Sequence, residues 1–129
     1  MNKDFNKWNK QKIWIDLHKE RHFFKEREVW WATVGENIGS EQDGKGTDFR
    51  RPVLIFKKFN TELFWGLPLS RKIKENNPYY IPITLEDGSI ESAITSQLRP
   101  LDAKRLIKRM GIVSKEEHQR IRKEVINLC

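Results

Sequence analysis

Cysteine, long apolar segments and internal repeats are what this sequence of 129 residues lacks or has little of. A single cysteine, Cys129, excludes an internal disulfide and a zinc site built from several cysteines. No apolar run approaches the roughly 18 residues of a membrane-spanning helix, and the Lys- and Asn-rich N-terminus has no apolar signal core. We therefore expect a cytoplasmic protein with no membrane segment, of a length that suits one domain.

The 25 basic and 18 acidic residues give a net charge of +7, which is unevenly distributed. Basic residues outnumber acidic ones by eight to five in 1–30 and by nine to four in 99–129, whereas 31–98 hold eight basic and nine acidic residues. The excess therefore lies in the flanking segments. There it fits either an acidic partner such as nucleic acid or an ordinary solvated helix face.

Hydrophobic patterning predicts a helical flank before a β-rich middle. Residues 5–24 lack proline and glycine and place Phe5, Trp8 and Ile15 on one helical stripe, so we predict a helical extension over 1–26. Short segments rich in aromatic and β-branched residues predict strands at 27–34, 51–59, 63–70, 79–85 and 90–95. Short strands in hairpins favour a small barrel or sandwich over a parallel sheet.

The hydrophobic period changes near the end of the chain and predicts two more helices. Asp102 can cap a helix over 103–110 that Gly111 closes. The sequence "SKEE" at 114–117 is a capping box that opens a last helix. The apolar face of this last helix consists of Ile121, Val125 and Leu128.

Two arginines precede a predicted strand in "DFRRPVLIF", residues 48–56. A solvated strand end is the simplest interpretation of Arg50 and Arg51, and contact with phosphate groups is the functional alternative. Ser70 ends the other strand of the same hairpin, so antiparallel pairing puts it at the same end of the sheet as Arg51. A hydroxyl at a strand end can also simply bond the following loop.

The aromatic and histidine residues have structural as well as functional interpretations. The adjacent Trp30 and Trp31 must point to opposite faces of a strand, so we expect one of them to be buried. His18 and His22 lie four residues apart, but with no third ligand evident we interpret them as surface residues and predict no metal site. His118, in the first turn of the last helix, is expected to be solvated.

Four ordered blocks of the sequence resemble the PemK/MazF family of toxins from bacterial toxin–antitoxin systems. These blocks are "EVWWATVGENIGSEQDGKGTDFRRPVLIF", "GLPLS", "SAITSQLRPLDAKRL" and "GIVSKEEHQRI". The resemblance covers about residues 27–126 and predicts a domain over 27–129. It implies an SH3-like small barrel, usually a homodimer, that cuts single-stranded RNA without a metal or other cofactor and is neutralised by an antitoxin protein.

The same resemblance implies the catalytic residues. The ribose 2′-hydroxyl attacks the adjacent phosphate, the arginine of "RP" is Arg51, and the hydroxyl residue that is threonine in many relatives is Ser70. A guanidinium suits this role because it donates two parallel hydrogen bonds to phosphate oxygens. Arg51 keeps its proton, however, so we infer that Glu41 in "GSEQ" serves as the general base or orients Arg51; a salt bridge that holds the loop is the structural alternative.

Further polar residues of these blocks and of the long glycine-rich loop over 35–49 are candidates for RNA binding. They are Gln42, Lys45, Arg50, Arg71, Gln97 and Arg99. Two other functions stay open at this point. The related barrel of CcdB-like toxins poisons DNA gyrase without hydrolysis, and a catalytically inactive barrel could serve as an interaction module.

Overall fold

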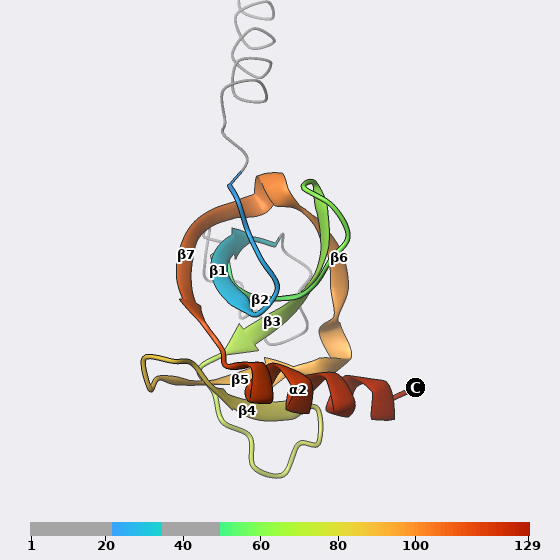
Figure 1. The fold of residues 1–129 in the computed structure, drawn as a ribbon. Helices are drawn as coiled ribbons and strands as arrows, with labels where there is room; N and C mark the ends of the chain where they lie inside the picture. Colours follow the sequence, from blue (N-terminus) through green and yellow to red (C-terminus); the bar gives the residue numbers. More distant parts are fainter. Residues whose placement is uncertain (1–21, 35–49) are drawn as a thin grey trace, which may run out of the picture.

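The computed structural model describes residues 22–34 and 50–129, which form an antiparallel sheet and one α-helix (Figure 1). The strands are β1 (Glu28–Thr33), β2 (Arg50–Lys58), β3 (Leu63–Ser70), β4 (Tyr80–Thr84), β5 (Ile90–Ile94), β6 (Arg99–Asp102) and β7 (Leu106–Ile112). Helix α2 (Lys115–Asn127) follows β7, and the 3-10 turns η1 (Thr95–Gln97) and η2 (Ala103–Arg105) flank β6. The five strands predicted from the sequence are confirmed within one or two residues at each end.

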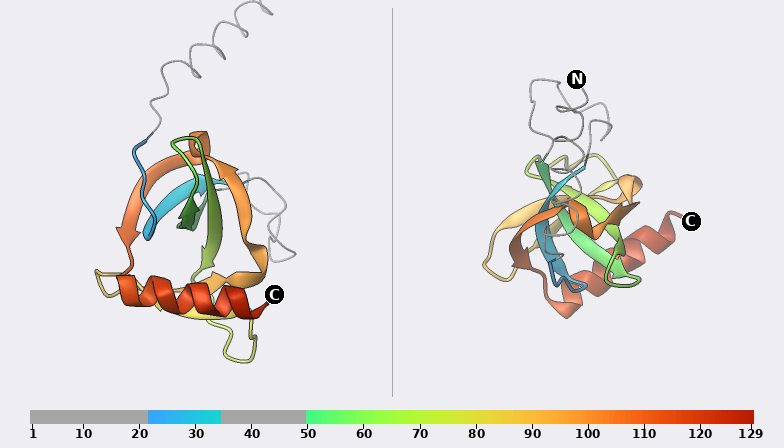
Figure 2. Two further views of the ribbon diagram at one scale, coloured as in Figure 1. Left: turned by 45° about the vertical axis from the view of Figure 1, so that its right-hand side comes forward. Right: turned by 90° about the horizontal axis from the view of Figure 1, so that it is seen from above.

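Strand β3 is the junction of the sheet. The strand order is β4-β5-β3-β2-β1-β7, and β6 also pairs with β3. The first part of β3 lies between β2 and β6, whereas its last two residues, Leu69 and Ser70, pair with Ala93 and Ser92 of β5. The strands therefore bend strongly, as Figures 1 and 2 show.

The predicted closure of the strands into an SH3-like barrel is not confirmed. The pairing forms an open path that ends at β4 and β7. Just beyond these end strands, the described chain has one isolated bridge, between Leu85 and Val113. The amide of Glu86 also donates to the carbonyl of Ile112 over 2.8 Å. The fold is thus a strongly curved antiparallel sheet with a single described C-terminal helix.

Apolar side chains fill both faces of the sheet because strand residues alternate between faces. One cluster joins Trp30, Ala32, Val53 and Ile55 with other buried residues, and the second joins Leu54 and Leu67 with α2. Gly66 is required where the first cluster is tightest, since a Cβ atom there would lie 2.6 Å from Cγ1 of Val53.

Phe24 belongs to the first of these clusters and packs on Phe64 with ring centroids 5.2 Å apart. The predicted helix over 5–24 lies outside the described residues except for its last three, which are not helical. The predicted boundary between an extension over 1–26 and a domain over 27–129 stays a prediction.

The helix predicted over 103–110 is wrong. Asp102 does cap the backbone, because its Oδ1 accepts from the amide of Lys104 over 2.8 Å, but only the 3-10 turn η2 follows. The chain then enters β7, which pairs with β1 from Glu28↔Ile112 to Ala32↔Leu106. Pairing of β7 satisfies backbone groups of β1 that would otherwise lie on an unpaired edge.

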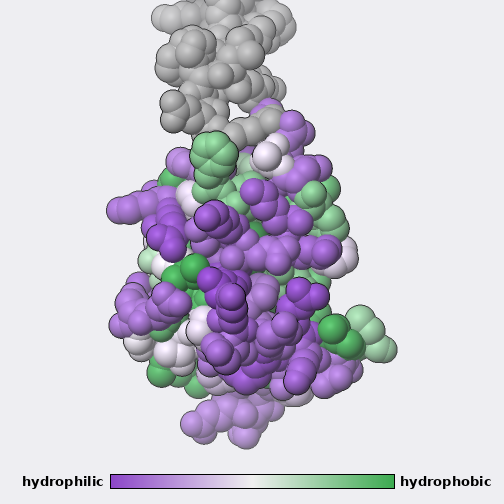
Figure 3. Space-filling model, viewed as in Figure 1, coloured by the Kyte–Doolittle hydropathy of each residue, from purple (hydrophilic) through white to green (hydrophobic). Residues whose placement is uncertain are grey.

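Helix α2 begins as predicted. The Oγ of Ser114 accepts from the amide of Glu117 over 3.1 Å. Ile121 and Val125 are buried against the sheet, whereas Leu128, predicted on the same apolar face of the helix, is the residue after the helix and is 45% exposed. The face of the molecule that carries α2 is mostly hydrophilic (Figure 3).

Candidate active site

The start of β2 brings Arg50 and Arg51 to one end of the sheet. Their Cα partners on β1 are Thr33 and Ala32, so the two arginines lie on opposite faces of the strand. Arg50 is exposed, whereas Arg51 is half-buried on the face that carries Val53. We refer to this part of the molecule as the Arg51 end.

Ser70 lies at the same end of the β2–β3 hairpin. Val53 pairs with Pro68, and two residues further along each strand, in the direction of the Arg51 end, the chain reaches Arg51 and Ser70. Residues in these positions point to the same face of the sheet. The Oγ of Ser70 accepts from the amide of Lys72 over 3.1 Å, which is the loop bond that the sequence also allowed, and its own hydroxyl proton is left available for donation.

Two more arginines reach this end from β6 and η2. Nη1 of Arg99 donates to the carbonyl of Val34 over 3.2 Å, and Nη1 of Arg105 donates to the carbonyl of Thr33, also over 3.2 Å. Thr33 is the partner of Arg50 across the ladder. Four guanidinium groups from three segments of the chain therefore gather near the start of β2. Sequence reasoning missed Arg105, because its place depends on the β1–β7 pairing.

A buried carboxylate lies one residue before Ser92, the strand partner of Ser70, and on the opposite face of β5 from Ser92. Glu91 of β5 is 3% exposed, and its Oε2 lies 3.9 Å from Nε of Arg71, whose side chain is mostly exposed. Burial raises the pKa of Glu91, although the charge of Arg71 opposes this shift. Glu91 was not predicted as a site residue; its signal was a lone charge within the strand sequence "IESAI".

Unpartnered polar atoms gather along the same segment. Among the described residues, Oε1 of Glu91, Oγ of Ser92 and Oε1 of Gln97 are buried without a hydrogen-bond partner. Ser92 is the strand partner of Ser70. Buried polar atoms nearly always have partners, so the segment from Glu91 to Gln97 is unusual within the described structure.

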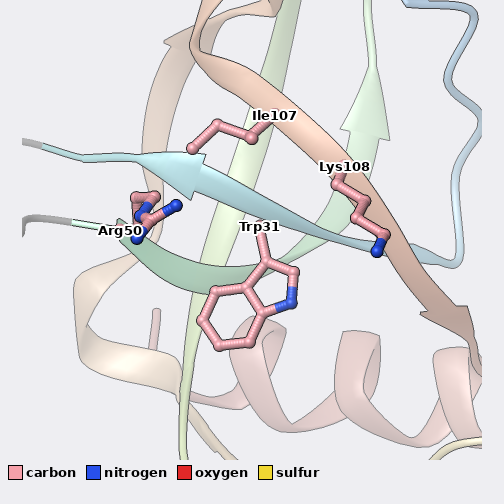
Figure 4. Close-up of a pocket in the computed structure, with 4 residues that line it drawn as sticks. All are labelled: Trp31, Arg50, Ile107 and Lys108. Atoms are coloured by element: carbon pink, nitrogen blue, oxygen red, sulfur yellow. The ribbon is translucent and has the colours of Figure 1, made fainter.

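A recess of about 350 Å³ opens beside Arg50 on the other face of β1, lined by Trp31, Arg50, Ile107 and Lys108. Figure 4 shows Trp31 projecting from β1 between Arg50 and Lys108. Lys108 is the β7 partner of Trp31, which explains why the cation flanks the indole ring. Trp30 is buried and Trp31 half-buried, which confirms that one of the pair is buried.

Three predicted site residues, Glu41, Gln42 and Lys45, lie outside the described residues. Within 22–34 and 50–129, no group of three His, Cys, Asp or Glu side chains is placed to hold a metal ion. No helix in these two segments is long and apolar enough to cross a membrane.

His118, expected to be solvated, is instead only 5% exposed, because it packs under β2 and bonds the carbonyl of Phe56.

A family model matches residues 25–129 and describes a PemK-like, MazF-like toxin of a type II toxin–antitoxin system. The match spans most of the chain and contains every described strand and helix. The chain belongs to the PemK/MazF toxin family.

Solved structures of PemK/MazF proteins share the fold. MazF (Form-I) from Deinococcus radiodurans superposes with a TM-score of 0.57 at 14% identity, over 83% of this chain and 96% of that chain. The MazE-MazF (Form-II) structure from the same organism gives 0.58 at 14% identity, over 83% and 95%. Mycobacterium tuberculosis toxin MazF-mt6 gives 0.56 at 11% identity, over 78% and 94%. No curated protein matches this PemK/MazF chain in sequence.

Proposed function

We propose that this protein is an endoribonuclease toxin that cuts single-stranded RNA in the cytoplasm without a metal or other cofactor. The observation that carries the proposal is that the β2–β3 ladder ends at Val53↔Pro68, with Arg51 and Ser70 each two residues beyond this pair at the same end of the hairpin. Arg99 and Arg105 add positive charge at that end. Such a concentration of guanidinium groups favours binding of the RNA backbone.

In the proposed reaction, the 2′-hydroxyl oxygen of a ribose attacks the adjacent phosphorus and the bond from phosphorus to the 5′ oxygen breaks. The products are a 2′,3′-cyclic phosphate and a 5′-hydroxyl. Charge on the non-bridging oxygens is stabilised by two parallel N–H donors of Arg51 and by the hydroxyl of Ser70. Arg51 does not accept the 2′ proton, because an arginine stays protonated up to a pKa above ~12.

Glu41 is the proposed acceptor of that proton, with orientation of Arg51 as its alternative role. A carboxylate can act as a general base when it lies within hydrogen-bond reach of the attacking hydroxyl. Replacement of Glu41 by Gln then lowers single-turnover cleavage and removes the rise of the rate with pH that ionisation of this group produces. An unchanged rate and an unchanged pH profile would exclude the base role.

The RNA on either side of the cut is proposed to contact the residues around the Arg51 end. Trp31 offers a ring for stacking of an unpaired base, and Arg50 and Lys108 beside it offer phosphate contacts. Gln97, Arg99 and Arg71 extend this surface on the other side of Ser70, and Gln42 and Lys45 are added from the sequence pattern.

A homodimer and a protein antitoxin complete the proposal. The structures of MazE-MazF from Deinococcus radiodurans support a partner of the antitoxin type for a chain of this family. The partner is expected to lay an acidic segment across the arginine-rich end, since opposite charges favour that placement. It would thereby compete with RNA for the same guanidinium groups.

The first experiment is incubation of wild type, Arg51→Ala and Ser70→Ala with a long unstructured RNA in EDTA, followed by mapping of the new 5′ ends. We expect discrete cuts with 5′-hydroxyl ends in the wild type, and loss of at least 100-fold in rate in the Arg51 variant. Lys123→Gln, on the exposed side of α2, is the control for general loss of positive charge. Circular dichroism checks that each variant is folded.

Cleavage that requires added Mg²⁺ would contradict the proposed mechanism. A folded, antitoxin-free wild type that cuts no RNA would favour the two alternatives, a gyrase poison of the CcdB type or an inactive interaction module. Inhibition of gyrase supercoiling by the purified protein separates these two.

A further inference from the structure

A second recess, of about 300 Å³, lies between the segment before β1 and the first turns of α2. It is lined by Glu26, Arg27, Lys115, His118, Gln119 and Arg122. It is remote from the Arg51 end, since His118 bonds to Phe56 near the opposite end of β2. The proposed cleavage reaction therefore makes no use of it.

His118 forms part of the wall of this recess and has one unused nitrogen. Its Nε2 lies 3.1 Å from the carbonyl oxygen of Phe56, which can only accept, so Nε2 carries the proton. In the neutral ring Nδ1 is then an acceptor. Nδ1 is buried and has no hydrogen-bond partner in the described structure, which is an unfavourable state for a buried polar atom.

Three cationic side chains surround the same recess. Arg27, Lys115 and Arg122 form no ion pair with any carboxylate of the described residues. The one carboxylate of the lining, Glu26, already accepts from the backbone amide of Lys58 over 2.8 Å. Positive charge therefore exceeds negative charge in the recess. Glu116 and Glu117 in the first turn of α2 lie outside this lining, and the partial positive charge of the helix N-terminus opposes their effect.

Arg27 is held in an unusual backbone conformation at this place. Its φ of 78° is the only positive value for a non-glycine residue among 22–34 and 50–129. Hydrogen bonds on both sides fix it, from its amide to the carbonyl of Ile55 over 3.0 Å and from the amide of Val113 to its carbonyl over 2.9 Å. Such strained positions often occur at binding sites, where they fix the direction of a side chain.

We propose that this recess binds a phosphate group. The phosphate oxygens accept from Arg27, Lys115 and Arg122, and the remaining P–OH of monohydrogen phosphate donates to Nδ1 of His118. This ligand supplies both the negative charge and the donor that the recess lacks. The inference goes beyond the proposed ribonuclease function, and its test does not depend on RNA cleavage.

The ionisation of His118 is consistent with this ligand. Burial lowers the pKa of His118, the bond to Phe56 and the charge of Glu26 oppose the shift, and the charges of Arg122 and Arg27 reinforce it. A ring that is neutral at pH 7 keeps Nδ1 as an acceptor. A bound anion would screen the two arginines and raise the pKa of His118.

The test is titration of inorganic phosphate into the full-length protein at pH 7, followed by NMR shifts of the amides around the recess. We expect saturable shifts at Arg27 and in the first turns of α2, and at least tenfold weaker binding in Arg122→Gln. The matched control is Lys123→Gln, which removes one charge from the same helix but outside the recess, and which should change the affinity by less than twofold. Sulfate, which has no proton at this pH, should bind more weakly than phosphate.

The proposal is overturned if phosphate gives no saturable shifts at these amides, or if Lys123→Gln weakens binding as much as Arg122→Gln. Because Arg122 is only half-buried, its variant tests the site even if a His118 variant fails to fold. A short 2′-O-methyl RNA with a 5′-monophosphate, which cannot be cleaved and whose terminal phosphate can carry a P–OH, then identifies the source of the phosphate. Competition with inorganic phosphate at these amides assigns the group to an RNA strand, and absence of competition assigns it to free phosphate.

Discussion

Glu91 and His118 are both almost completely buried, yet burial moves their pKa values in opposite directions. Glu91 lies near the Arg51 end of the β2–β3 hairpin and its pKa is raised, whereas His118 lies near the other end and its pKa is lowered. The cause is the same at both places, since loss of solvation penalises the charged form. The neighbouring arginines differ in effect: Arg71 stabilises the charged form of Glu91, while Arg27 and Arg122 disfavour the charged form of His118.

The two ends of the hairpin differ in whether a carboxylate compensates the charge of their arginines. At the Arg51 end, a carboxylate faces an arginine, so part of the charge is already compensated. At the His118 end, the arginines have no carboxylate partner among the described residues and surround a neutral ring. We expect changes at the first end to alter chemistry and changes at the second to alter stability and anion binding.

The largest expected effect is at the Arg51 end. Arg51→Lys keeps the charge but loses the two parallel donors, so we expect cleavage to fall by about 100-fold or more, close to the effect of Arg51→Ala. Single-turnover rates on one defined RNA measure this. A rate within threefold of wild type would show that charge alone is needed at this position.

His118→Leu tests the other end. The substitution leaves the carbonyl of Phe56 buried without a donor, so we expect the free energy of unfolding at pH 7.5 to fall by about 1–3 kcal/mol. Urea denaturation provides the measurement, with Gln119→Leu on the exposed side of α2 as the control. Equal stability of wild type and His118→Leu would mean that the buried bond contributes nothing net.

His118 and Glu91 should change the stability of the protein in opposite directions as the pH falls. Because the folded pKa of His118 is lowered, its contribution is fully present above the unfolded value of 6.5 and is lost as the pH falls through the folded pKa. Because the folded pKa of Glu91 is raised above 4.5, its contribution is greatest at low pH and is lost as the pH rises through the folded pKa. His118→Gln should therefore remove a loss of stability on acidification, and Glu91→Gln should remove a gain. Denaturation series from pH 4 to 8 would contradict this if both variants changed the slope in the same direction.

The smallest expected effect is that of Glu91→Gln on cleavage. The variant frees the exposed side chain of Arg71, and ion pairs with an exposed partner contribute about 0.2–1 kcal/mol, so we expect a decrease of about twofold to fivefold in rate. If Arg71 binds the substrate, the lower rate should result mainly from a higher KM for RNA. A decrease of 100-fold with unchanged KM would instead assign Glu91 a direct part in proton transfer.

Local sequence signals predicted the features that depend on nearby residues. Alternation and turn residues predicted five strands, and the Asp87–Gly88 turn forms, with Gly88 at φ 92°. The hairpin from β2 to β3 was sufficient to predict that Arg51 and Ser70 share one end of the sheet. Ser114 identified the start of α2 for the same reason, since a cap needs only the next three residues.

Features set by distant residues were missed. The segment over 106–112 has a helix-like pattern and a capping aspartate before it, but pairing with β1, some 80 residues earlier in the chain, makes it a strand. His118 is buried by Phe56, 62 positions away. Glu91 and the Trp31 recess likewise depend on how β3 leaves β2 for β5 and on the pairing of β7 with β1. No local pattern contains this information.

The junction at β3 limits where residues can be inserted into the chain. Of the described strands, β3 alone pairs with three others, β2, β5 and β6, so one residue added within it would shift three sets of partners at once. The turn over Glu86–Ser89 between β4 and β5 joins strands that meet in a simple hairpin. Insertions and peptide tags should therefore be tolerated at Gly88 and rejected at Gly66, and a library of single-residue insertions screened for soluble protein would reveal this contrast.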